Sequence, residues 1–103
     1  MVVRARANPG RGGELLDMFG ELATATHAEE GCTLFALHRA HDDHDVIVLV
    51  ERWASREALD AHLAAPHLAS FRRESVELFA EPSQIAVVEP VPAGDPVKGL
   101  LAG

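Results

Sequence analysis

Four side chains that could act on a small molecule lie in one stretch, VIVLVERWASREALDAHLAAPH. They are Glu51, Trp53, His62 and His67. Imidazole accepts or donates a proton near neutral pH, and a carboxylate can hold it in one orientation. An indole adds a flat apolar surface with one N–H donor. The combination predicts a small-molecule pocket in which Glu51 orients His62 or His67 as an acid–base group, beside the flat surface of Trp53.

Each of these residues also has a structural alternative. A Trp at the end of a strand is commonly part of the core, and a Glu there is commonly solvated or paired. A His at the margin of an apolar helix face is commonly a hydrogen-bonded boundary residue. The residue types alone leave both interpretations open.

The pocket would be built on the strand that carries two of these residues. Val46–Trp53 begins with VIVLV, the longest apolar run of the chain, and predicts a buried strand. Glu51 and Trp53 stand two residues apart on it, so their side chains point to the same face, about 7 Å apart.

A pair of helical segments follows this strand. Ser55 is a good N-cap for a helix that runs to about Ala65. Pro66 then interrupts the helix and can start a new one, which continues to about Phe79. Phe71 lies on the apolar stripe of this second segment, and we expect it to contact the substrate.

The remaining segments complete one domain. Their order, strand, helix, strand, strand, helix pair, strand, predicts an α+β, ferredoxin-like βαββαβ fold, with helices on one face of an antiparallel sheet. We expect the domain to span residues 1–91, followed by a Pro- and Gly-rich C-terminal tail, 92–103, whose order the sequence leaves open. The other predicted elements are a strand at Met1–Ala7, a helix at Glu14–His27 and strands at Cys32–Arg39 and Gln84–Val91.

The central strands are apolar on both faces. In CTLFALHR and VIVLVERW both alternating sets of side chains are largely hydrophobic. An antiparallel sheet with one solvated face would instead alternate polar and apolar residues. Because the helices cover only one face, we expect a homodimer in which the other faces of two sheets pack together.

Composition excludes several classes of partner. The net charge of −7, from 16 acidic residues against 9 Lys and Arg, argues against binding to nucleic acid or to an anionic membrane. Cys32 is the single cysteine and cannot form an internal disulfide, so a cytoplasmic location is the simplest expectation. The N-terminal run MVVRARANPG lacks the apolar segment of a signal peptide, and no run is long enough to span a bilayer.

A second group of His residues lies in the run HRAHDDHD. His41 and His44, three residues apart in an Asp-rich turn and without a Cys pair, do not form a zinc signature, so we predict no metal site. His38 points with Ala36 and Leu34 on its strand, and we expect it to line the substrate cavity.

The chain resembles the antibiotic biosynthesis monooxygenase family, and most closely its quinol monooxygenase branch. The resemblance covers residues 1 to about 91 and is carried by EEGCTLFALHR and IVLVERWASREALDAHLAAPHLASF. The matching positions are Glu51, Trp53, Ser55, His62, Pro66 and His67.

This resemblance implies a dimeric α+β barrel that oxygenates an electron-rich aromatic with O₂, without flavin, haem or metal. It further implies that His62 or His67 is the base or oxyanion partner, that Trp53 walls the aromatic ring and that Glu51 orients a His. The chain departs from the family in having no Tyr. Asn8 lies at the end of the first predicted strand rather than within it, which disfavours the haem-degrading branch.

Two other functions stay open. The same fold could serve as a non-catalytic small-molecule-binding or dimerisation domain, since one fold hosts many functions. It could also be an isomerase or lyase that uses the same His as a proton shuttle.

Overall fold

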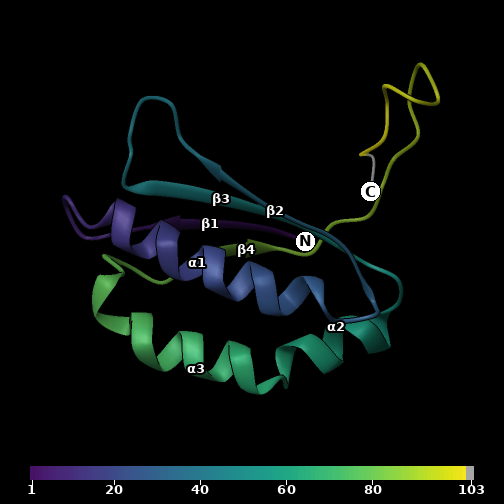
Figure 1. The fold of residues 1–103 in the computed structure, drawn as a ribbon. Helices are drawn as coiled ribbons and strands as arrows, with labels where there is room; N and C mark the ends of the chain where they lie inside the picture. Colours follow the sequence, from purple (N-terminus) through teal and green to yellow (C-terminus); the bar gives the residue numbers. More distant parts are fainter. Residues whose placement is uncertain (102–103) are drawn as a thin grey trace.

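A computed structural model of the chain describes residues 1–101. Figure 1 shows a four-stranded sheet with a layer of helices beneath it. The elements are β1 (Val2–Arg6), α1 (Gly12–His27), β2 (Cys32–Arg39), β3 (Val46–Trp53), α2 (Arg56–Leu63), α3 (Pro66–Ser75), a short 3₁₀ helix η1 (Val76–Leu78) and β4 (Gln84–Ala86).

The sheet has the strand order β2-β3-β1-β4, and every neighbouring pair is antiparallel. The helices lie on one face (Figure 1), so the predicted ferredoxin-like α+β fold is confirmed. The predicted last strand was too long, because β4 pairs with β1 only from Gln84 to Ala86. β4 is an edge strand, and Pro90 in the segment that follows has no N–H with which to extend the ladder.

The longest helix, α1, packs on the sheet through one apolar stripe. Leu15, Phe19 and Leu22 are buried on α1, where they meet Val3 and Leu49 of the sheet in one core cluster. The helix begins at Gly12, two residues before the predicted start at Glu14, and ends at His27 as predicted. The free energy gained by burying this apolar stripe holds α1 on the sheet.

The chain breaks between helices α2 and α3, where the sequence predicts an interruption. The hydroxyl of Ser55 accepts a hydrogen bond from the backbone N–H of Ala58 at 3.1 Å and caps α2. Ala65 is extended, with φ −69° and ψ 143°, and Pro66 begins α3. The continuation ends earlier than predicted, because α3 stops at Ser75 and only a 3₁₀ turn carries the chain towards Phe79.

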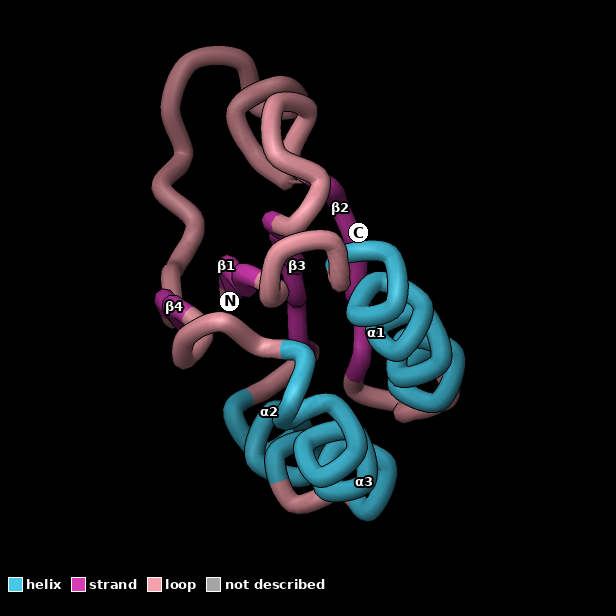
Figure 2. Tube along the Cα trace, turned by 90° about the vertical axis from the view of Figure 1, so that its left-hand side faces the viewer, coloured by secondary structure: helices cyan, strands magenta, loops and turns pink. Residues whose placement is uncertain are grey.

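The chain after β4 contains no further helix or strand up to residue 101. Figure 2 shows this segment rising away from the helices, on the far side of the sheet. The Arg52 guanidinium donates a hydrogen bond to the Leu101 carbonyl at 2.8 Å, which brings the segment back to β3. The last part of the predicted tail, residues 102–103, lies outside the described residues. Within residues 1–101, no helix has both the length and the apolar character needed to cross a bilayer.

Candidate active site

A cavity of about 640 Å³ lies between the sheet and the helical layer. Its size is within the usual range for small-molecule sites, and most of its lining is apolar. Phe19, Phe35, Leu49 and Phe71 contribute apolar side chains from four different elements. Only a few polar side chains reach it, and the buried ones among them are Glu51, His62 and Ser75.

His62 connects this cavity to a cluster of polar groups behind it. Its side chain lines the cavity and is 2% exposed. Its Nδ1 lies 2.8 Å from Oε2 of Glu29, and Nε2 of His67 lies 2.8 Å from the same oxygen. Neither Glu29 nor His67 is among the residues that line the cavity. One carboxylate oxygen therefore holds two imidazoles, and only one of them reaches the cavity.

The position of Glu29 depends on a close contact between its loop and α2. A Cβ added at Gly31 would lie only 2.2 Å from the Cβ of Ala58 on α2. The Gly31 carbonyl also accepts a hydrogen bond from the backbone N–H of Ala54 at 2.8 Å. Glycine therefore lets the loop between α1 and β2 approach α2 closely enough for Glu29 to reach His62.

The electrostatics of the cluster fix where the protons lie. Partial burial raises the pKa of Glu29, but the hydrogen bonds donated by His62 and His67 outweigh it, so that the pKa is held below its ordinary value. An ionised carboxylate only accepts hydrogen bonds. The proton of the neutral His62 ring must then sit on Nδ1, which leaves a lone pair on Nε2. Among the described residues, none is hydrogen-bonded to Nε2.

Glu51 and Trp53 point to the same face of β3, as predicted. The indole Nε1–H of Trp53 donates to Oε1 of Glu51 at 3.0 Å. The Trp53 ring lies over His62, with ring centroids 4.5 Å apart and planes inclined by 33°. Glu51 is 4% exposed, and burial raises its pKa, although the bond from Trp53 opposes this. The predicted pairing of Glu51 with a His is wrong. Both imidazoles are hydrogen-bonded to Glu29, and Glu51 is hydrogen-bonded to the indole of Trp53.

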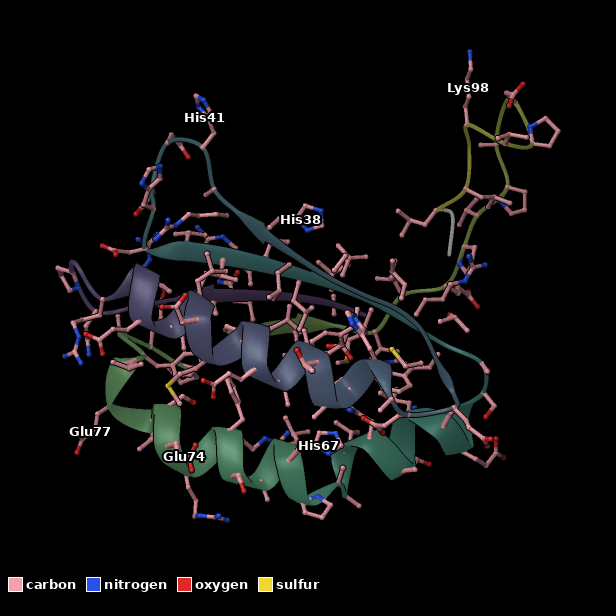
Figure 3. The ribbon with its side chains drawn as sticks, viewed as in Figure 1. His38, His41, His67, Glu74, Glu77 and Lys98 are labelled. Atoms are coloured by element: carbon pink, nitrogen blue, oxygen red, sulfur yellow. The ribbon has the colours of Figure 1, made fainter. Side chains whose placement is uncertain are left out.

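The structure brings most of the predicted site residues together. Glu51, His62 and Phe71 line the cavity. Trp53 does not line the cavity, and its ring instead packs against the His62 ring. His67 lies at the junction of α2 and α3 (Figure 3), where it bonds Glu29.

His38 is placed elsewhere. It is exposed on β2 and points away from the helices (Figure 3), so it does not line the cavity. The sequence prediction for His38 is therefore corrected. Strand alternation explains the difference, because His38 pairs with Val48 in the register of the outer face, whereas the neighbouring Leu37 pairs with the cavity residue Leu49.

Glu29 is the functional candidate that the sequence prediction missed. It stands in the short loop after α1, where the run Glu29-Glu30-Gly31 suggested only the end of a helix. One signal was present in the sequence. A Gly directly before a strand permits a close approach of the backbone, and an acid two residues before it would be carried into that contact.

Comparison with known proteins agrees with this fold. The family model described as antibiotic biosynthesis monooxygenase matches residues 1–74. The chain therefore belongs to the antibiotic biosynthesis monooxygenase family.

Individual relatives fit this assignment. Rv0793 of Mycobacterium tuberculosis, which is provisionally named a monooxygenase, is 32% identical over 91 residues, or 88% of this chain and 89% of that protein. Its solved structure covers 91% of this chain and 95% of its own, with a TM-score of 0.81 at 31% identity. A crystal structure of an antibiotic biosynthesis monooxygenase has a TM-score of 0.82 and covers 88% of this chain and 96% of its own. Its 23% identity supports the fold alone.

Proposed function

We propose that this protein is a cofactor-independent monooxygenase that oxidises a quinol or polycyclic phenol with O₂, and that His62 is its base. One observation carries the proposal. The ionised Glu29 holds the proton of His62 on Nδ1, so the Nε2 lone pair is the one available to a molecule in the cavity. An imidazole held this way by a carboxylate is a general base, and the same carboxylate stabilises the imidazolium that forms.

The reaction balances with O₂ as the only co-reactant. His62 Nε2 takes the phenolic proton, and the electron-rich phenolate transfers electrons to O₂ as a C–O bond forms at a ring carbon that bears hydrogen. The proton returns to the peroxide. Loss of the C–H proton then breaks the O–O bond, so that one oxygen stays as a carbonyl and the other leaves as water. A hydroquinone with a free ring position would thus yield a hydroxyquinone and water.

The cavity supports the substrate class. Its apolar lining, with Phe19, Phe35 and Phe71, suits a flat aromatic molecule, and its volume of about 640 Å³ is large enough for several fused rings. Glu51 adds a carboxyl whose raised pKa favours the protonated form, which can donate a hydrogen bond to a developing oxyanion. An apolar lining also excludes water, so that less of the peroxide is lost in side reactions with water.

The test is O₂ consumption with a series of hydroquinones and naphthols, for the wild type and for His62→Ala. We expect His62→Ala to reduce kcat/KM by about 10²–10⁴-fold, the usual contribution of a general base. Equal rates in both proteins would remove His62 from the mechanism. Thermal stabilisation by a quinone without turnover would favour a binding domain. Turnover in the absence of O₂ would favour an isomerase or lyase.

A further inference from the structure

The cluster of Glu29, His62 and His67 has the composition of a metal site. One carboxylate oxygen and two imidazole nitrogens, one atom from each residue, all lie within 4.8 Å of one another. Two His and one carboxylate form a ligand set common to zinc and to other divalent first-row metals. These three residues come from the α1–β2 loop and from the two sides of the break between α2 and α3. The sequence prediction of no metal considered only the run around His41 and could not foresee this set.

We propose that Glu29, His62 and His67 bind one divalent transition-metal ion, and that this ion switches off His62 as the base. The second half of the proposal rests on the proposed function. The first half stands on the geometry of the three side chains.

The distances suit a metal after a small adjustment. Each nitrogen lies 2.8 Å from Oε2 of Glu29. In a tetrahedral zinc site with bonds of about 2.0–2.1 Å, neighbouring ligand atoms lie about 3.4 Å apart. Each nitrogen therefore needs to move about half an ångström away from the Glu29 oxygen to admit the ion, while all three ligand atoms already lie within 4.8 Å of one another. The Glu29 and His67 side chains are 19% and 28% exposed, so both have room to move.

The surroundings provide both support and access. The His62 ring packs against Trp53, with centroids 4.5 Å apart, and against Phe35, with centroids 5.8 Å apart, so apolar neighbours hold one ligand in place. The partly exposed Glu29 and His67 open the cluster to solvent. Within residues 1–101, no hydrogen bond reaches the other oxygen of Glu29, Oε1, which is free to complete the coordination together with water.

Metal binding would change the chemistry of the nitrogen on the cavity side. A metal on Nδ1 takes the place of the proton there, and the neutral ring then carries its proton on Nε2. Nε2 becomes a hydrogen-bond donor and loses the lone pair that would take the phenolic proton. The site would therefore couple the availability of metal to the activity of the enzyme, with His62 shared between the two.

The experiment titrates metal-free protein with Zn²⁺ by calorimetry and with Co²⁺ by visible absorption. We expect one ion per chain, at least about tenfold weaker binding in Glu29→Gln and in His67→Gln, and unchanged binding in His41→Gln, whose His is exposed on the β2–β3 hairpin. No saturable binding by the wild type would overturn the site. Equal affinity in Glu29→Gln, His67→Gln and His41→Gln would do the same.

A measurement on the wild type alone protects the test against variants that fail to fold. Crystals soaked in Zn²⁺ should show an anomalous peak between Glu29, His62 and His67, and a peak elsewhere would refute the site. In the activity assay, Zn²⁺ should lower turnover at least tenfold, and a chelator should restore it. Binding without inhibition would overturn the switch. Binding in a protein with no turnover would leave the metal site standing and refute the proposed oxygenase.

Discussion

Replacement of Glu29 by Gln tests the arrangement on which the proposed base depends. Gln keeps the size of the side chain and can still accept the Nδ1–H of His62 through its amide oxygen, but it removes the charge. A hydrogen bond to a charged partner contributes about 1.5–3 kcal/mol, and a neutral one about 0.5–1.5 kcal/mol. Only the bond to His62 gains strength when the imidazolium forms, so the loss in the transition state is about 1–2 kcal/mol. We therefore expect kcat/KM to fall about 5–30-fold.

A second variant separates charge from orientation. Glu29→Leu removes the acceptor altogether, so His62 loses its fixed tautomer, and we expect a loss of about 10²–10⁴-fold. The matched control is Glu30→Gln, since Glu30 is the exposed neighbour in the same loop. The assay is O₂ consumption at neutral pH. Rates that match Glu30→Gln in both Glu29 variants would refute the reasoning.

Three further predictions concern stability and assembly. Gly31→Ala should lower the free energy of unfolding by about 1–3 kcal/mol, because the new Cβ would lie 2.2 Å from the Cβ of Ala58. Gly20 lies in the middle of α1, where a new Cβ would have no neighbour within 4 Å, so Gly20→Ala should raise the free energy of unfolding by about 0.5–1 kcal/mol. Chemical denaturation measures both changes. Burial raises the pKa of Glu51, so its contribution to stability is present below the unfolded pKa and is lost as pH rises through the folded one. Glu51→Gln should therefore raise Tm at pH 8 but not near pH 4, and an equal change at both would contradict this. We also expect the wild type to sediment as a homodimer. Val48 lies on the outer face of β3, so Val48→Asp should convert the dimer to a monomer. A wild type that sediments as a monomer at micromolar concentration would exclude the dimer.

The sequence was sufficient for the fold because the local signals agreed with one another. The apolar run of β3, the cap at Ser55 and the break at Pro66 all lie where the periodicity and turn chemistry predict them. The edge strand β4 was predicted less well, since its length depends on a partner strand and not on its own residues.

The site was predicted in part for a related reason. Glu51 and Trp53 share a face through a fixed period of two, so their contact follows from the sequence. The contact of Glu29 with His62 spans 33 positions, and it depends on how closely one loop approaches another element. No periodicity encodes such a distance. The single Gly that permits it has the same appearance in a sequence as a Gly in an ordinary turn.

The break between α2 and α3 is what allows one carboxylate to hold two imidazoles. On a continuous helix each residue advances by about 100°, so His62 and His67, five positions apart, would point about 140° away from each other. The extended Ala65 redirects the chain before Pro66, and the two rings instead lie with centroids 6.1 Å apart. A continuous helix could have placed one His at the cavity but not a second one behind it. The interruption therefore has a chemical consequence, because it couples a buried imidazole at the substrate cavity to a partly exposed one at the surface through the same Glu29 oxygen.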